Sequence, residues 1–217
     1  MKHKKALDLS RFSFETKRDI NFYIKEKFQD SSKLTKRQIS KIENVAKYLE
    51  EGFPRDYLIG NSEFYGRNFL VDESVLIPRP ETEVLIDIIK SLNLSNDSVL
   101  CDLGTGSGCI GISLAMLNKG FIVFGVDISD DAIKVARKNN FIYQEKNFFL
   151  IQSDWASCFQ KDSIDCIISN PPYIDKNDYH LEDLKHEPLL ALVSDSKGLE
   201  AFEIITQPVS YTHLRAH

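Results

Sequence analysis

Asn170, Pro171, Pro172 and Tyr173 directly follow an apolar run in the stretch IISNPPYI. Each proline holds its φ at about −65° and lacks a backbone N–H donor, so the stretch is stiff and rich in carbonyl oxygens. The side-chain oxygen of Asn170 adds an acceptor, and the Tyr173 ring offers a flat apolar face. Such a group of acceptors suits a planar carboxamide or aromatic NH2 group. The stretch therefore predicts a site that binds and orients such a nitrogen.

The nitrogen of a carboxamide or aromatic NH2 group is a poor nucleophile because its lone pair is delocalised. Acceptors that hold both N–H bonds would orient this nitrogen and favour the positive charge that develops on it when it attacks an electrophile. This route needs no strong general base, and the sequence offers no clear candidate for one. We therefore predict Asn170, Pro171 and Tyr173 as catalytic residues. The alternative is a proline-stabilised exit from a core strand.

The stretch CDLGTGSGCIG is a second candidate site, because it joins an apolar run to a helical pattern. Gly104, Gly106 and Gly108 allow a sharp turn and let a ligand approach the main chain closely. Asp127, at the end of the next apolar run, would hold ribose hydroxyls. The spacing of Gly106, Gly108 and Gly111 also matches the dinucleotide fingerprint. The loop thus indicates a nucleoside-bearing cofactor, with a purely structural turn as the alternative.

Asp102 stands just before this loop and bears on the choice of cofactor. A carboxylate at the end of a buried strand needs partners, because burying it alone is costly. It suits a cationic ligand, whereas it would repel a pyrophosphate. S-adenosylmethionine carries a sulfonium and an ammonium group. Asp102 therefore favours this methyl donor over a nicotinamide dinucleotide.

The elements that must position these residues follow from the hydrophobic pattern. Apolar runs alternate with amphipathic segments from residue 98 onward, which predicts a parallel sheet of Rossmann-like, doubly wound α/β type. The expected strands are residues 98–104, 121–129, 147–155 and 163–170, with helices at 107–118 and 130–144. In such a sheet the fourth strand lies beside the first, so the NPPY stretch borders the cofactor crevice.

Length and composition allow one large domain with a small appendage. The chain has 217 residues, of which 42% are hydrophobic. Residues 1–60 show helical spacing at 18–28 and 39–52 and carry a net charge of +5, against −10 for the remainder. An extended hairpin at 63–71 and a helix from near Pro80 should follow. The acidic main body argues against stable DNA binding. Four cysteines without metal or redox spacing, no long apolar run and no secretory leader indicate a cytoplasmic protein.

Several stretches together resemble the protein-(glutamine-N5) methyltransferases that act on peptide chain release factors. They are DLGTGSGCIGISLA, VDIS, QSDW, IISNPPYI, LIPRPETE and HEPLLAL, within residues 20–207. The glycine motif alone is common, and NPPY is shared with adenine-N6 DNA methyltransferases, but the combination is specific. The resemblance implies a class I S-adenosylmethionine-dependent methyltransferase core with a small helical N-terminal domain. It also implies the glutamine of a release factor GGQ loop as substrate.

Motif by motif, the resemblance also implies roles for individual residues. The substrate glutamine would be held by Asn170, Pro171, Pro172 and Tyr173. The cofactor would be held by Gly104, Thr105, Gly106, Ser107, Gly108, Asp127, Trp155 and Asn170. From its position at the end of the third expected strand, Trp155 would pack along the adenine and Asp154 would accept from its amino group, although Trp155 also suits a half-buried surface aromatic.

Two flanking segments carry further candidates. By the same resemblance, Arg79 and Glu81 would line the rim of the site as substrate-binding residues; from the residues alone, they could serve only the start of the helix at Pro80. His186 and Glu187 lack further ligands at metal-binding spacing, so we expect no metal. Their segment should fold, as a substrate-side loop, over the stretch from Asn170 to Tyr173, which we call the clamp.

These patterns predict four parts of the chain and leave competing functions open. The parts are a helical substrate-recognition domain (1–60), a hairpin and linker (61–80), a partial methyltransferase domain (81–207) and a tail foreign to the fold (208–217). Because further C-terminal strands are expected in the family, we expect this chain to have weak or absent activity. We also expect a monomer. The competing functions are an adenine-N6 nucleic-acid methyltransferase, a cofactor-binding but inactive fragment and, more distantly, a nicotinamide-dependent dehydrogenase.

Overall fold

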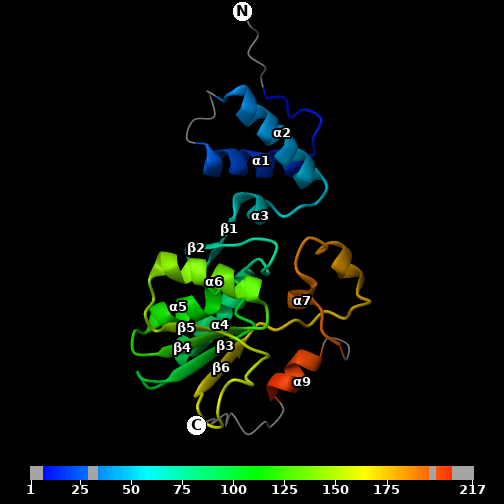
Figure 1. Cartoon of the computed structure of the whole chain (residues 1–217). Helices are drawn as coiled ribbons and strands as arrows, with labels where there is room; N and C mark the ends of the chain where they lie inside the picture. The colour runs from blue at the N-terminus through cyan, green and yellow to red at the C-terminus, as the bar shows by residue number, and fades with distance from the viewer. Residues whose placement is uncertain (1–6, 29–33, 196–198, 207–217) are drawn as a thin grey trace, which may run out of the picture. The chain divides into compact units, whose positions relative to one another are not determined.

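The computed structural model describes residues 7–28, 34–195 and 199–206 (Figure 1). The tail predicted for residues 208–217 lies outside these described residues. The chain divides into two compact units, Met1–Gly60 and Asn61–His217. The roles expected for the separate domains remain predictions.

The first unit consists of helices that pack on one apolar cluster. Ser13 caps the first helix by accepting from the Thr16 N–H, and Thr35 forms a reciprocal capping box with Gln38 at the second. The helices are α1 (Phe14–Lys27), α2 (Lys36–Glu50) and α3 (Arg55–Ile59). The buried residues recur at helical spacing and include Ile20, Tyr23, Ile24, Ile42, Val45 and Ala46. Both helices that the sequence predicted are confirmed, each beginning three or four residues earlier than expected.

The second unit begins with a short antiparallel hairpin and continues as a parallel sheet. The hairpin strands are β1 (Asn61–Phe64) and β2 (Arg67–Leu70). The sheet strands are β3 (Val99–Leu103), β4 (Ile122–Asp127), β5 (Phe148–Gln152) and β6 (Cys166–Ser169), in the order β5-β4-β3-β6. All three neighbouring pairs are parallel. The prediction that the fourth strand lies beside the first is confirmed.

Helices accompany the strands as the alternating pattern predicted. They are α4 (Val84–Ser91), α5 (Cys109–Leu117), α6 (Asp130–Tyr143), α7 (Leu189–Leu192) and α9 (Glu200–Thr206), with 3-10 turns η2 (Pro80–Glu83) and η3 (Tyr179–Glu182). The turn that begins at Pro80 is a 3-10 turn, and α4 follows it directly. Ser129 caps α6 by accepting from the Ala132 N–H.

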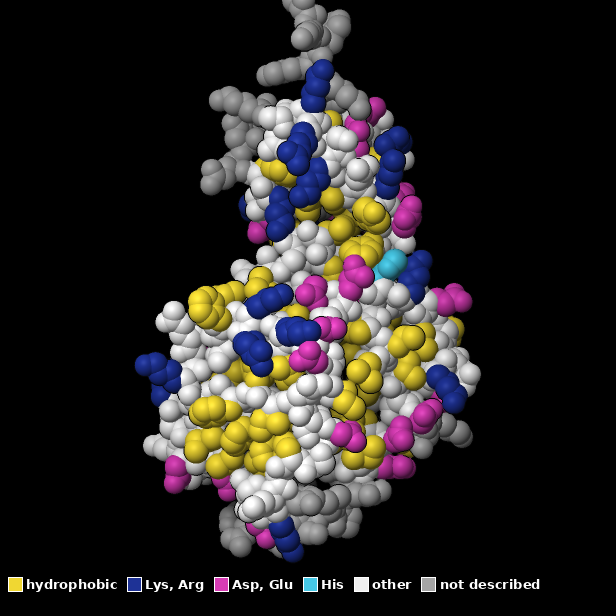
Figure 2. Space-filling view, in the orientation of Figure 1, with side chains coloured by type: hydrophobic (Ala, Val, Ile, Leu, Met, Phe, Trp, Pro, Cys, Tyr) yellow, Lys and Arg dark blue, Asp and Glu magenta, His cyan; other side chains and the backbone are white. Residues whose placement is uncertain are grey.

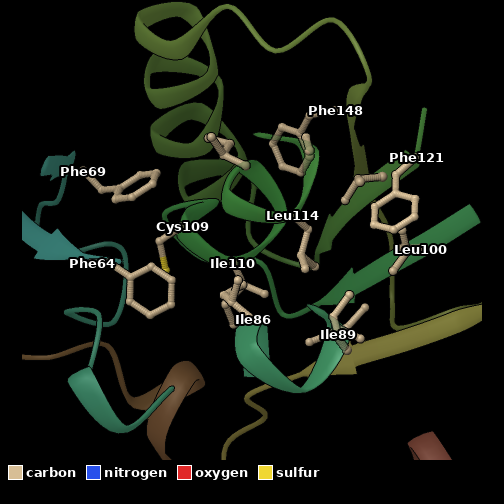
Figure 3. Packing of buried hydrophobic residues seen from close by; sticks show 14 residues of the cluster. Phe64, Phe69, Ile86, Ile89, Leu100, Cys109, Ile110, Leu114, Phe121 and Phe148 are labelled. Carbon is tan, nitrogen blue, oxygen red and sulfur yellow. The ribbon is translucent and has the colours of Figure 1, made fainter. Parts of the chain in front are cut away.

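One face of the sheet carries the main core. Figure 3 shows Leu100, Phe121 and Phe148 meeting apolar side chains of α4 and α5, among them Ile86 and Leu114. Helix α5 is apolar nearly all round and buried, as expected of a helix enclosed by the core. This packing holds the start of α5 against the end of β3, where the glycine loop lies.

The other face is less completely covered than the sequence predicted. Residues 153–165 connect β5 to β6 without a helix, and Trp155 and Phe159 from this connection pack on the strands beside Ile205 of α9. Figure 2 shows hydrophobic side chains gathered over the strands, and Phe149 on β5 is 46% exposed. Within the described residues, therefore, the expectation of helices on both faces is only partly met.

Candidate active site

A cavity of about 510 Å3 lies at the carboxyl ends of the sheet strands, where ligands of doubly wound folds bind. Its wall combines the glycine loop, the ends of β4 and β5, and the start of the NPPY stretch. The predicted cofactor residues on this wall are Gly104, Thr105, Gly106, Ser107, Asp127, Asp154, Trp155 and Asn170. The structure thus brings most of the predicted cofactor set to one cavity.

The glycine loop uses several backbone N–H groups within the protein. The N–H groups of Gly104 and Thr105 donate to the Val126 carbonyl at 2.8 and 2.9 Å. The N–H of Gly106 donates to Oδ2 of Asp127 at 2.9 Å. A pyrophosphate would compete for these donors and would face the Asp127 carboxylate. The loop geometry therefore disfavours the dinucleotide alternative that the glycine spacing left open.

Gly104 and Gly106 have free space beside their Cα atoms, whereas Gly108 is closely packed. All three have positive φ, of 73°, 53° and 81°. An added Cβ would meet nothing closer than 4.0 Å at Gly104 or Gly106, so a ligand can approach the backbone there. At Gly108 it would come within 3.2 Å of Ala136, because this residue packs against α6 and does not line the cavity. Gly108 therefore supports the loop from behind.

Asp127 is the acid best placed for a ribose. Its Oδ1 accepts from the Ser129 N–H at 2.9 Å, while Oδ2 accepts from Gly106, and the half-buried side chain lines the cavity. Burial raises the pKa of Asp127 above its usual range, and the hydrogen bonds from Ser129 and Gly106 oppose that shift. A carboxylate oriented in this way can also accept ribose hydroxyls.

Asp102 lies behind the loop and not on the cavity wall. Its side chain is fully buried, and Oδ2 accepts from the Thr105 hydroxyl at 2.6 Å and from the Gly111 N–H at 3.0 Å. The direct ligand contact that we expected from the sequence is therefore corrected, because a strand residue facing α5 cannot reach the cavity surface. Asp102 instead joins the loop to the first turn of α5.

Burial raises the pKa of Asp102 to about 6, from an ordinary value of 3.8. Because the folded state binds this proton more tightly than the unfolded state, the carboxyl stabilises the fold below pH 3.8, and this contribution is lost as the pH rises through 6. Relative to an Asp102→Asn variant, the free energy of unfolding should therefore fall by about 2 kcal/mol between pH 4 and pH 7. Urea titrations at several pH values measure this difference, and a difference independent of pH would contradict the assignment.

A second cavity, of about 560 Å3, adjoins the first at the NPPY stretch. Its wall includes the predicted substrate residues Arg79, Glu81, Asn170, Pro171 and Tyr173. Pro172 instead lines the first cavity. The residues that line both cavities are Leu76, Arg79, Thr82, Asn170 and Ala191. Asn170 therefore stands where a cofactor site and a substrate site would meet.

The clamp is anchored to the sheet at its start, whereas Asn170 and Tyr173 are available to a ligand. The Ser169 hydroxyl donates to the Leu103 carbonyl at 2.7 Å, which ties the end of β6 to the end of β3. Pro171 is buried, whereas Tyr173 is 59% exposed. Among the described residues, no hydrogen bond engages the Asn170 carboxamide. Its acceptor and donors thus remain available to ligands.

The two flanking segments meet beside the clamp, although they lie far apart in the sequence. Oε1 of Glu187 pairs with Nη2 of Arg79 at 2.5 Å, and Oε2 accepts from the Ile77 N–H at 3.1 Å. The segment after Glu187 then pairs with the end of the clamp through a parallel bridge between Ile174 and Val193. The segment that contains Glu187 therefore closes one side of both cavities.

Several residues of the cavity wall carried no strong sequence signal. Ile128, which directly follows Asp127, lines the first cavity and is 51% exposed although it is apolar. An apolar residue that directly follows a strand-end acid suits the face of an adenine. The position of Ile128 after Asp127 could therefore have marked it as a cofactor contact from the sequence. Leu190 and Ala191 also line the wall, but only the folding of α7 against the clamp brings them there.

The first cavity fits S-adenosylmethionine by its size and its donor set. Its volume lies within the range of about 300–1,000 Å3 that is usual for small-ligand sites. Acids for a ribose and for cationic groups, apolar faces for a base, and two glycines open to the cavity are all present. Within residues 7–28, 34–195 and 199–206, no cluster of three or more His, Cys, Asp or Glu side chains could hold a metal. No helix in this part of the chain has the length and apolarity needed to cross a membrane.

Comparison with known proteins agrees with this geometry. The family described as "Methyltransferase small domain" matches residues 80–187. The chain is 38% identical over 182 residues to a release factor glutamine methyltransferase of Mycoplasma mycoides, covering 82% of this chain and 64% of that protein. It is 35% identical over 195 residues to a release factor glutamine methyltransferase of Buchnera aphidicola, covering 89% and 69%.

The chain spans less than two thirds of the length of the Mycoplasma protein. Among solved structures, it matches Trm5b from Pyrococcus abyssi with a TM-score of 0.43 and 25% identity, over 64% of this chain and 39% of that chain. A TM-score this low adds nothing to the assignment. The identity to the Buchnera protein over more than two thirds of its length, together with the methyltransferase domain, shows that this chain belongs to the family of release factor glutamine methyltransferases.

Proposed function

We propose that this chain transfers a methyl group from S-adenosylmethionine to the side-chain amide nitrogen (N5) of the glutamine in the GGQ loop of peptide chain release factors. The observation that carries the proposal is the meeting of two cavities at Asn170. One cavity is lined by the glycine loop and strand-end acids, and the other by Pro171 and Tyr173. The names of the Mycoplasma and Buchnera relatives support the release factor as substrate.

The residues of the first cavity have roles that suit the methyl donor. When bound, S-adenosylmethionine supplies an electrophilic methyl group on a positively charged sulfur. In our proposal, Asp127 accepts hydrogen bonds from the ribose hydroxyls. Ile128 and Trp155 offer apolar faces to the adenine, and Asp154 accepts from its amino group. Gly104 and Gly106 leave room for the cofactor against the backbone.

The residues of the second cavity act on the nitrogen that receives the methyl group. The side-chain oxygen of Asn170 and the backbone carbonyl of Pro171 accept the two N–H bonds of the glutamine carboxamide, and Tyr173 packs on its plane. These acceptors bind the nitrogen more strongly as positive charge develops on it. They therefore stabilise the transition state more than the ground state. The surplus proton passes to water after transfer.

We further propose the remaining context of the reaction. The helical unit Met1–Gly60 recognises the release factor, and the protein acts as a monomer in the cytoplasm. The cysteines support a reducing compartment, because all four are free thiols. Burial also raises the pKa of Cys109 to about 12. Such a thiol remains protonated and unreactive.

Labelled methyl transfer tests the proposal. The chain is incubated with labelled S-adenosylmethionine and, in parallel, a release factor, a release factor whose GGQ glutamine is replaced by asparagine, and duplex DNA. We expect a methyl group on the GGQ glutamine alone, located by mass spectrometry of the peptide. Label on DNA alone would make the chain an adenine methyltransferase. Cofactor binding without any transfer would make it an inactive fragment, as the expected weak activity of this chain allows.

A further inference from the structure

The charges on the wall of the first cavity are uneven. Among its described lining residues, four side chains are acidic: Asp127, Asp131, Asp154 and Glu200. Arg79 is the only cation in the same described set, and it also lines the second cavity. Among the charged side chains in this described set, only Arg79 would attract an anionic group that enters the cavity.

Arg79 is held in place by a buried carboxylate. The Glu187 side chain is 4% exposed, and its two oxygens accept from Arg79 and from the Ile77 N–H. Breaking such a buried pair is costly, so Glu187 fixes the direction of the guanidinium. A guanidinium has five N–H donors, and the structure shows one of them engaged within the described residues. The Arg79 side chain is 33% exposed, so its other donors can reach a ligand.

We propose that Arg79 binds the α-carboxylate of the methionine part of S-adenosylmethionine and that Glu187 positions Arg79 for this contact. The inference rests on the proposed function, because it assumes this cofactor. The cofactor has two cationic groups and one anionic group. The acids of the wall suit the sulfonium and ammonium groups, and Arg79 suits the carboxylate, for which a guanidinium fork is the best-matched partner.

Two ligands that differ only in the carboxylate test this inference. Isothermal titration calorimetry compares S-adenosylmethionine with decarboxylated S-adenosylmethionine on the full chain. We expect the unsubstituted chain to bind the decarboxylated ligand about 10- to 100-fold more weakly, the range for a lost charge-assisted hydrogen bond. Arg79→Met should bind the two ligands with affinities within about threefold of each other, because it lacks the group that distinguishes them. Its affinity for the decarboxylated ligand should match that of the unsubstituted chain.

Glu187→Gln separates positioning from structural support. This variant keeps the size of the side chain and an acceptor. It should lower the affinity for S-adenosylmethionine and leave the affinity for the decarboxylated ligand unchanged. Arg79→Lys should recover part of the preference, since a lysine keeps the charge but loses the fork. Thermal unfolding followed by circular dichroism shows that each variant is folded.

The outcomes distinguish this inference from the function on which it rests. Equal weakening of both ligands in Arg79→Met would mean a merely structural role and would overturn the inference. Unchanged binding of both ligands, with a raised KM for the release factor, would assign Arg79 to the protein substrate and would also overturn it. Failure of the unsubstituted chain to bind either ligand would remove the proposed cofactor itself, and the inference with it.

Discussion

Replacing Asn170 by alanine is expected to lower methyl transfer to a release factor by about 100- to 1,000-fold, the usual effect of removing one preorganised hydrogen-bonding group at the reacting centre. Asn170 stands at the junction of the two cavities, and no protein group among the described residues engages its carboxamide. Its oxygen is therefore free to accept from the nitrogen that receives the methyl group. Single-turnover transfer with the chain in excess over the release factor measures this loss.

Cofactor binding and a matched variant separate this catalytic effect from general damage. Asn170→Ala should lower the affinity for S-adenosylmethionine by no more than about 10-fold, the equivalent of one ordinary hydrogen bond. Tyr173→Phe keeps the exposed ring of the clamp and loses only the hydroxyl, so its transfer rate should stay near that of the unsubstituted chain. Transfer by Asn170→Ala at a comparable rate to Tyr173→Phe would remove Asn170 from the mechanism.

Replacing Gly111 by alanine is expected to lower the free energy of unfolding by about 2–3 kcal/mol, a large share of the stability of an ordinary domain. An added Cβ would lie 2.4 Å from Cε2 of Phe148 and 3.2 Å from Oδ2 of Asp102. The Phe148 ring has no room to retreat, because it also lies against Gly125, where a Cβ would come within 2.6 Å. Alanine favours a helix over glycine by about 1 kcal/mol, which is too little to offset this overpacking.

Making the same Gly111→Ala substitution in a Phe148 variant isolates the contact between Gly111 and Phe148. Figure 3 shows Phe148 in the core cluster beside α5, and Phe148→Leu removes most of the ring that an alanine would strike. In this background, Gly111→Ala should cost less than about 1 kcal/mol or stabilise the helix. Urea unfolding of the four proteins of this double-mutant cycle measures the coupling. The same cost in both backgrounds would show that the contact is not the cause.

The sequence by itself determined the sheet and the meeting of the two main motifs. Apolar runs separated by amphipathic segments bury both faces only in a parallel sheet, and right-handed crossovers then place the fourth strand beside the first. The glycine loop after β3 and the stretch from Asn170 to Tyr173 after β6 had to share one edge of that sheet. These features depend on local pattern and chain connectivity, so they were predictable.

Only the tertiary structure decided which polar residues face the cavity. Asp102 and Asp127 are both acids near strand ends, and their types alone suggested similar roles. Packing turns Asp102 toward α5, where it meets Gly111, whereas Asp127 faces the loop and the cavity. A side chain's direction at the end of a strand depends on the helix that covers it, and a single sequence does not specify that packing.

The pairing of Arg79 with Glu187, which are far apart in the sequence, could not be predicted from the sequence either. The two residues lie in segments that the sequence marked separately, one before α4 and one after the clamp. The chain returns to the clamp through a parallel bridge between Ile174, just after the clamp, and Val193, just after α7, and no local pattern encodes that return. Local propensities thus set the elements and their order, whereas the partners of individual charged groups depend on long-range packing that only the folded chain defines.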